Sequence, residues 1–253
     1  MRYIYISVSA LMFATSAFAA NNAALISSKE RYIRCIALAE RDPRTGYDQA
    51  KAWRDGGAAA SHCEAIALVS LGHYSEAANI LANLARNGAV GDAAMRAQLF
   101  DQAGNAWLLA NLPNNAMQSF SAALAVTPNA IDVLADRARA RAMLKDWNGA
   151  EADLTGALLL DQNRADLLVL RASAHHALGH KTEAATDLLR ALSLYPNYPA
   201  ALVERGTMKY EAGDMNGARA DWNKAAASPS GGEAAETARR NLSAMGPVLK
   251  PGK

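Results

Sequence analysis

The sequence predicts an all-α fold made of stacked pairs of helices. From Ala97 to Gly232 the chain repeats every 34 residues without an insertion, which is the period of a helix–turn–helix repeat. Small residues recur at fixed positions within each repeat, and one large residue recurs at the twenty-fourth. Repeats of this kind bury their apolar faces against their neighbours, so we expect one continuous solenoid domain.

Residues 1–19 have the pattern of a secretory signal peptide. Arg2 supplies a positive start, an apolar core follows, and Ala17-Phe18-Ala19 fits the small-x-small cleavage pattern. We therefore expect cleavage after Ala19 and a periplasmic or secreted protein. A spanning helix needs about 20 apolar residues, and neither this segment nor any later one meets that requirement, so no membrane span is predicted.

Two less regular segments follow. Residues 20–57 predict an N-terminal pair of helices, a degenerate repeat whose second helix should stop at Gly56-Gly57. Residues 58–91 predict a looser repeat with its inter-helix turn at 71–77. A short offset then precedes the regular run.

Four consecutive units, 97–130, 131–164, 165–198 and 199–232, keep the same phase. Their eighth position is small, as is expected where two helices cross closely: Gly104, Ala138, Ala172 and Gly206. The twentieth position is Ala116, Ala150, Ala184 and Ala218, and the large twenty-fourth position is Phe120, Leu154, Leu188 and Trp222.

This pattern resembles the tetratricopeptide-repeat (TPR) family, strongly after Ala97 and weakly before Ala58. The resemblance implies a right-handed α/α superhelix. It also implies a protein-binding scaffold that holds an extended peptide or a partner helix in a concave groove lined by the first helix of each unit.

The resemblance also implies which residues line that groove. The matching positions are Gln98, Asp101, Asn105 and Leu108; Asp132, Asp136, Arg139 and Met143; Asp166, Leu170, Ser173 and His176; and Val203, Glu204, Thr207 and Tyr210. Acids outnumber bases and apolar residues are interleaved, which favours a partner segment that alternates apolar and basic residues; a merely solvated face is the alternative. Members that clamp a C-terminal carboxylate use lysine, arginine and asparagine here, and only Arg139 and Asn105 fit that mode.

Residues 233–246 predict a C-terminal capping helix, and 247–253 a flexible tail. An apolar stripe in this helix faces the last repeat while charged residues face away: Ala235, Ala238, Leu242 and Met245 form the stripe. Such a polar-backed helix solvates the open end of a solenoid. A helix that docks a partner is the alternative.

Cys35 and Cys63 lie on predicted first helices of neighbouring units. In an exported chain the oxidising compartment favours a disulfide between them. Two buried free thiols are the alternative.

Two further patterns invite functional readings. Arg137, Arg171 and Arg205 at the seventh position are each followed, 16 residues later, by Asp153, Asp187 and Asp221. This spacing predicts an ion pair within each unit, and a phosphate-binding arginine ladder is the alternative. His175, His176 and His180 suggest a metal site, but Gly179 ends the helix, and no carboxylate or cysteine is placed in the sequence so as to complete a ligand set with them. We therefore expect one packed and two solvated histidines and no bound metal.

The formal net charge of +2 and the lack of a basic stripe argue against nucleic-acid binding. Nucleophile-elbow, zinc-protease and dinucleotide-binding motifs are missing, so we expect neither an enzyme nor a cofactor. The signal peptide and the resemblance together indicate an exported scaffold or adaptor that serves cell-envelope assembly. The alternative is a self-assembling structural protein that binds no foreign peptide.

Overall fold

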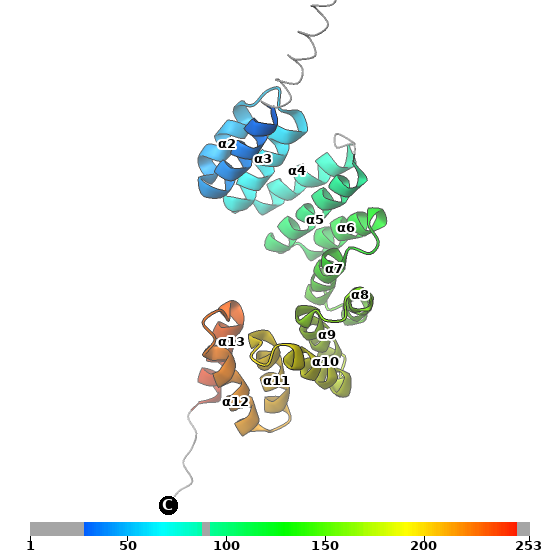
Figure 1. Cartoon of the computed structure of the whole chain (residues 1–253), viewed down its shortest axis with the longest axis vertical. Coiled ribbons are helices and arrows are strands. Elements are labelled where there is room, and N and C mark those ends of the chain that lie inside the picture. The colour runs from blue at the N-terminus through cyan, green and yellow to red at the C-terminus, as the bar shows by residue number, and fades with distance from the viewer. Residues whose placement is uncertain (1–27, 88–91, 247–253) are drawn as a thin grey trace, which may run out of the picture. The chain divides into compact units, whose positions relative to one another are not determined.

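The computed structural model describes residues 28–87 and 92–246 (Figure 1). Within these ranges the chain consists of helices and short connections, without a strand, so the prediction of an all-α repeat solenoid is confirmed. The predicted signal peptide at 1–19, residues 20–27, the end of the predicted 58–91 repeat and the predicted tail at 247–253 lie outside the described residues. None of the described helices is both long enough and apolar enough to cross a membrane.

The chain divides into two compact units; the first ends at Ala110 and the second begins at Asn111. The first unit contains a helix at 28–41 and then α2 (Pro43–Ala52), α3 (Gly57–Ser70), α4 (Tyr74–Arg86) and α5 (Ala93–Leu109). Consecutive helices pack against one another from α2 to α5. The second helix of the degenerate repeat ends at Ala52 rather than at Gly56-Gly57, because Trp53 leaves the helix and buries its ring against Gly56.

The second unit contains α6 (Pro113–Val126), α7 (Ile131–Met143), α8 (Trp147–Leu160), α9 (Ala165–Ala177), α10 (Lys181–Leu194), α11 (Pro199–Glu211), α12 (Met215–Ala226) and α13 (Gly232–Met245). Each helix from α7 onward packs on the one before it, and the first helices of successive repeats also touch, α7 with α9 and α9 with α11. These three helices will be called the first helices of the second unit.

The turns inside the repeats need a left-handed backbone residue. Gly72, Gly179 and Gly213 fill this place with φ near +80°, a conformation that glycine adopts without steric cost. In the 131–164 repeat Lys145 takes it at φ 61°. The next residue starts the second helix; Asp146, for example, accepts a hydrogen bond from the Gly149 N–H as an N-cap.

The core of the second unit consists mainly of alanine and leucine, with Trp222 in the last repeat. The eighth position needs a small residue there: a Cβ on Gly206 would lie 2.5 Å from Trp222 Nε1. The repeats 131–164 and 165–198 instead combine alanine at the eighth position with leucine at the twenty-fourth. Glycine thus makes room for the larger ring.

Helix α13 packs on both α12 and α11. Ala235 and Ala238 are buried, and Leu242 and Met245 pack on the core as the apolar stripe predicts. Arg239 donates a hydrogen bond to the Ala226 carbonyl, whose helix has ended. This helix therefore covers the end of the last repeat.

A disulfide joins Cys35 of the 28–41 helix to Cys63 of α3. The Cα atoms are 6.0 Å apart, within the usual range for a disulfide. Both cysteines are fully buried among Ala39, Ala50 and Ala67. The bridge ties the N-terminal helix to the next repeat.

Candidate functional site

The repeated arginines of the second unit are held by aspartates. Arg171 donates from Nε and Nη2 to the two carboxylate oxygens of Asp187, at 2.8 and 2.7 Å, and the same bidentate contact joins Arg137 to Asp153 and Arg205 to Asp221. The three aspartates are buried. These pairs are structural, and the alternative of a phosphate-binding ladder fails because an anion already occupies each guanidinium.

A second base from the first helix faces each of these aspartates. Arg141 Nε lies 3.4 Å from Asp153, and Lys209 Nζ lies 2.9 Å from Asp221. In the middle repeat the same place is taken by His175, whose Nε2 is 3.8 Å from Asp187. Burial alone would raise the pKa of Asp221, but hydrogen bonds from Arg205 and Lys209 lower it.

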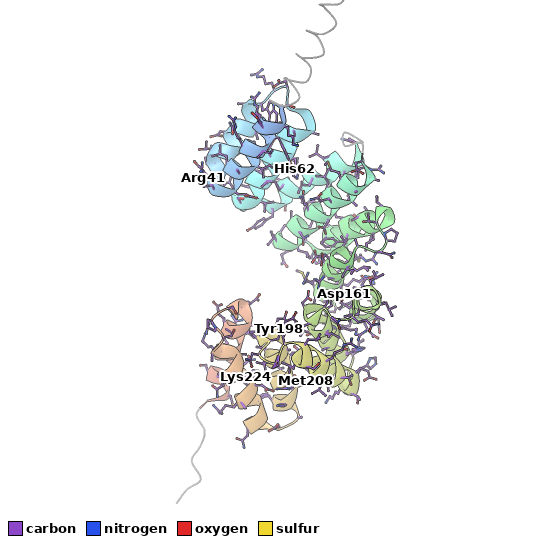
Figure 2. All side chains as sticks on the ribbon, in the orientation of Figure 1. Arg41, His62, Asp161, Tyr198, Met208 and Lys224 are labelled. Atoms are coloured by element: carbon purple, nitrogen blue, oxygen red, sulfur yellow. A yellow bond between two sulfur atoms is a disulfide. The ribbon has the colours of Figure 1, made fainter. Side chains whose placement is uncertain are left out.

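Salt bridges connect several predicted groove residues of the second unit. Arg164, the N-cap of α9, donates to Asp132 at 2.9 Å and to Asp166 at 2.8 Å, and so links α7 to α9. The Arg164 hydrogen bond is the main reason why the pKa of Asp166 is lowered. Burial is the main reason why the pKa of Tyr198, labelled in Figure 2, is raised, and the charge of Asp166 adds to this effect.

His176 links α9 to α11. Its Nδ1 is 3.1 Å from Glu204 and its Nε2 is 2.8 Å from Glu211. Burial by itself would lower the pKa of His176, but these two carboxylates outweigh it and the pKa is raised. The expectation that His176 is solvated is wrong, because α11 supplies both glutamates across the repeat boundary.

The remaining predicted residues of the second unit lie on the same helices. Arg139, Leu170 and Ser173 line a small pocket of about 150 Å³ between α7, α8 and α9. Asp136 pairs with Arg139, and Thr207 donates a hydrogen bond to the carbonyl of Val203, its neighbour on α11. Met143 and Tyr210 are exposed apolar side chains.

We call these residues the acidic face of the second unit, defined as Asp132, Asp136, Arg139, Met143, Arg164, Asp166, Leu170, Ser173, His176, Val203, Glu204, Thr207, Tyr210 and Glu211. Five carboxylates stand there against two guanidinium groups and His176. The excess of negative charge therefore persists although ion pairs neutralise part of it. Arg164 and Glu211 are additions to the predicted set. Arg164 ends a repeat in sequence, yet it caps the next first helix.

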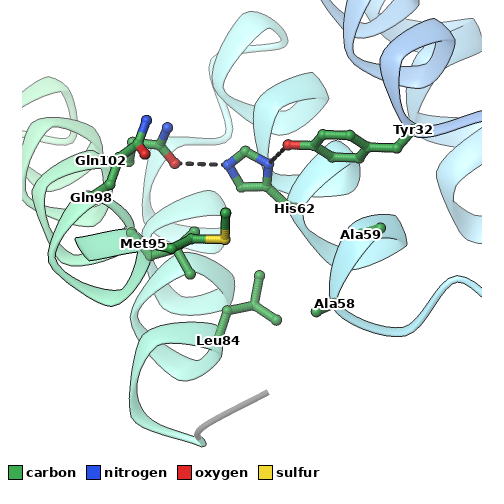
Figure 3. A pocket seen from close by; sticks show the side chains of 9 residues that line it. Tyr32, Ala58, Ala59, His62, Leu84, Met95, Gln98 and Gln102 are labelled. Atoms are coloured by element: carbon green, nitrogen blue, oxygen red, sulfur yellow. Dashed lines mark hydrogen bonds between the residues drawn. The ribbon is translucent and has the colours of Figure 1, made fainter. Parts of the chain in front are cut away.

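In the first unit the structure reveals a pocket that the sequence did not predict (Figure 3). It has a volume of about 320 Å³. His62 of α3 lines it between Gln102 and Tyr32, with Nδ1 2.6 Å from the Tyr32 hydroxyl and Nε2 2.8 Å from Gln102 Oε1. Because Gln102 offers an oxygen acceptor, His62 Nε2 carries the proton and Tyr32 donates to Nδ1. Burial raises the pKa of Tyr32.

The polar side chains of this pocket come from alternate helices, the 28–41 helix, α3 and α5, which are first helices of their repeats. The rest of the wall is mostly apolar, with Ala58, Ala59, Leu84, Met95 and Leu99. Predicted groove residue Gln98 also lines it. We call this site the His62 pocket.

The other predicted residues of α5 lie outside that pocket. Asn105 donates a hydrogen bond to the Asp101 carbonyl one turn earlier, and Leu108 is half-buried. A sequence signal for His62 existed: it stands at the fifth position of the 58–91 repeat, as Asp101 does in the 97–130 repeat. The groove positions that the resemblance implies begin at Gln98 and so do not extend to this looser repeat.

No protein-family model matches the chain, and no curated protein matches it. Several solved structures are similar to the chain. One is MamA from Desulfovibrio magneticus RS-1, with a TM-score of 0.56 and 18% identity over 70% of this chain and 92% of that one. Another is YrrB, described as a TPR protein with an unusual peptide-binding site, with a TM-score of 0.53 and 17% identity over 77% of this chain and 97% of that one. At this identity the likeness shows the fold.

Proposed function

The chain has the fold of tetratricopeptide-repeat proteins, and from this premise we propose that it is an exported protein-binding scaffold whose first helices hold an extended peptide or a partner helix. The observation that carries the proposal is the His62 pocket. Its wall is mostly apolar and, apart from Leu84 of α4, comes from first helices, and its volume suits one large apolar side chain of a partner. Apolar anchors buried in such pockets supply most of the affinity of an interface.

The acidic face of the second unit indicates which charge the partner should carry. Its carboxylates outnumber its bases, and exposed Met143 and Tyr210 stand among them. Basic residues of a partner would be steered toward this face. We therefore propose a ligand segment that combines apolar anchors with lysine or arginine.

Export and a role in cell-envelope assembly complete the proposal. The signal-peptide pattern at 1–19 supports export, and the Cys35–Cys63 disulfide is compatible with an oxidising compartment. Mass spectrometry of the protein recovered from the cell envelope or medium should find Ala20 at the N-terminus. An intact residue 1–19 segment on cytoplasmic protein would contradict export.

A peptide array tests the binding proposal. The chain without residues 1–19 should retain peptides that contain Lys or Arg beside apolar residues, and added salt should weaken the signal because it screens the charges. Filling the His62 pocket with Ala59→Leu should reduce binding at least tenfold. Asp136→Lys should reduce it further for basic peptides.

Ala52→Leu is the matched control, since Ala52 is exposed at the end of α2 outside the pocket. It should bind like the unchanged protein. Equal binding by Ala59→Leu and Ala52→Leu, or a preference for acidic or free-carboxylate peptides, would refute the proposed site.

A second candidate function, self-assembly, is favoured by one observation. Leu159 and Leu160 at the end of α8 and Leu189 on α10 are large apolar side chains that are exposed. Exposed apolar side chains that gather on one surface mark interaction sites, and in this proposal a second copy of the chain would cover these leucines. Light scattering should then show a dimer that Leu159→Glu dissociates, whereas a monomer at all concentrations would exclude this function.

A further inference from the structure

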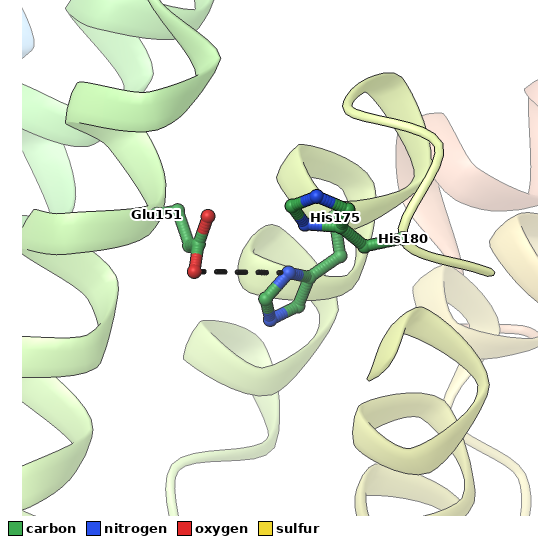
Figure 4. A group of neighbouring side chains, drawn as sticks. All are labelled: Glu151, His175 and His180. Carbon is green, nitrogen blue, oxygen red and sulfur yellow. Dashed lines mark ion pairs between the residues drawn. The ribbon is translucent and has the colours of Figure 1, made fainter. Parts of the chain in front are cut away.

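Three potential metal ligands from different places in the sequence meet in the second unit (Figure 4). They are Glu151 of α8, His175 of α9 and His180, the N-cap residue before α10. One ligand atom from each lies within 4.8 Å of the other two, and His175 Nδ1 is 4.0 Å from Glu151 Oε1. The sequence hides this group because Glu151 belongs to the preceding repeat.

His175 gives an independent sign of a ligand. Its Nδ1 is inaccessible to solvent and has no hydrogen-bond partner among the described residues, while the whole residue is 8% exposed. A buried polar atom without a partner costs free energy. Nδ1 is also the atom that faces Glu151, at a distance too long for a hydrogen bond and wide enough for an ion between them.

The charges around His175 favour Nδ1 as the nitrogen that binds a metal. Its other nitrogen, Nε2, faces Asp187 at 3.8 Å, and Arg171 fixes that carboxylate with two hydrogen bonds. A carboxylate beside the second nitrogen favours the proton there and leaves Nδ1 as the electron-pair donor. The other repeats of the second unit use Arg141 or Lys209 at this place; neither is a metal ligand.

The remaining two ligands can close the coordination sphere. His180 is exposed and its side chain makes no capping hydrogen bond, and Glu151 is half-buried. Tetrahedral zinc places its ligand atoms about 3.3 Å apart, so small rotations of these two side chains suffice. A cavity of about 370 Å³ lined by Glu151, His175, Glu183 and Asp187 adjoins the group and leaves room for a water as fourth ligand.

The donor set selects the class of ion. Two imidazoles and one carboxylate suit zinc, copper and nickel. Calcium needs six to eight oxygen ligands, so it does not fit. Glu151, Glu183 and Asp187 against Arg171 give the cavity a negative charge that favours a divalent cation.

We propose that Glu151, His175 and His180 form a binding site for one divalent transition-metal ion of the zinc class, which would join α8, α9 and the start of α10. The site is separate from the acidic face and from the His62 pocket, and the proposal does not depend on peptide binding.

Zinc titration of the full chain in competition with a chromophoric chelator tests the proposal. Both cysteines are in the disulfide, so thiolates do not compete. We expect one zinc ion per chain, a higher melting temperature with zinc, and no effect of calcium. His180→Ala and Glu151→Gln should each weaken zinc binding at least tenfold.

Two further variants separate metal binding from folding. His175→Lys should abolish zinc binding yet stay folded by circular dichroism, because lysine occupies this place opposite Asp221 in the last repeat. His73→Ala is the matched control, since His73 precedes α4 as His180 precedes α10 and is likewise exposed. A chain that binds no zinc, or His180→Ala and His73→Ala variants with equal affinity, would overturn the proposal.

Discussion

At the level of single residues, the repeats of the second unit share one arrangement of a buried aspartate with two bases, and the 165–198 repeat departs from it. Each buried aspartate receives an arginine and a second base, and in the 165–198 repeat that second base is His175. The His175 imidazole, 3.8 Å away and beyond hydrogen-bond distance, compensates Asp187 less than Lys209 at 2.9 Å compensates Asp221. Asp187 therefore depends on Arg171 more than Asp221 depends on Arg205.

Replacing these arginines should reveal the difference. Arg171→Ala should lower the free energy of unfolding by about 2 kcal/mol or more, because a buried carboxylate loses its charged partner. Arg205→Ala should cost about 1 kcal/mol, since Lys209 still reaches Asp221 at 2.9 Å. Urea unfolding of both variants measures the costs.

The double variant Arg171→Ala, Asp187→Ala is the control, and its cost should be less than the sum of the single costs. Additive costs would mean that the pair does not interact.

His176 should make the contact between α9 and α11 depend on pH. Its pKa is raised in the folded chain by Glu204 and Glu211, against the effect of burial, so folding favours the protonated form. Its contribution to stability is fully present below the unfolded pKa of about 6.5 and is lost as pH rises through the folded value. The melting temperature should therefore fall as the pH rises from about 6.5 through the raised folded pKa.

His176→Gln isolates this effect from the other titrating groups. The variant should lose part of the decrease that the unchanged chain shows over the same pH range. Identical pH profiles for the two proteins would show that the link to the glutamates contributes nothing.

At the level of helices, the disulfide compensates for the least regular part of the repeat array. It closes a loop with a sequence separation of 28 between the 28–41 helix and α3. In the chain-entropy model such a loop closure is worth about 3.5 kcal/mol. Reduction should therefore increase hydrogen exchange in the 28–41 helix and α2 and leave α9 and α10 unchanged.

Thiol labelling of the denatured, unreduced protein provides the control for that experiment. No thiol should react before reduction and two should react after it. Two reactive thiols without reductant would show that the bridge is not formed.

The packing at the crossing of α11 and α12 can be tested with one substitution whose effect on stability should differ between two backgrounds. Gly206→Ala should destabilise by about 1–3 kcal/mol, because its Cβ would lie 2.5 Å from Trp222 Nε1 and force the ring to shift. In a Trp222→Leu background the same change recreates the alanine and leucine of the preceding repeats. There it should be neutral or stabilise by up to about 1 kcal/mol, since alanine favours helix. Thermal unfolding of the four proteins measures the coupling, and a destabilising effect of equal size in both backgrounds would contradict the packing argument.

At the level of the whole molecule, contacts in each unit run mainly between neighbouring helices. Stability in such an array is close to a sum of local terms. A chain that ends after Ser230 lacks α13 and should show faster hydrogen exchange in α11 and α12, with no change in α3. Equal protection of α11 and α12 with and without α13 would show that the helix is not a cap.

The period of the sequence predicted the fold because each repeat makes its structure with residues close in sequence. The ion pair between Arg171 and Asp187 was predictable for the same reason. Contacts across repeats were not. Glu211 reaches His176 from the next repeat, and Glu151 approaches His175 from the previous one. No periodic pattern marks such singular residues, so only the fold brings them together.

The aspartate–arginine pairs carry a consequence for the history of the chain. Since each negative charge is balanced by a partner 16 residues away in its own repeat, duplicating or deleting a 34-residue block would strand no carboxylate in the interior. Gene segments that encode such blocks can multiply without first acquiring compensating mutations. The number of repeats can therefore change without leaving a buried aspartate unpaired.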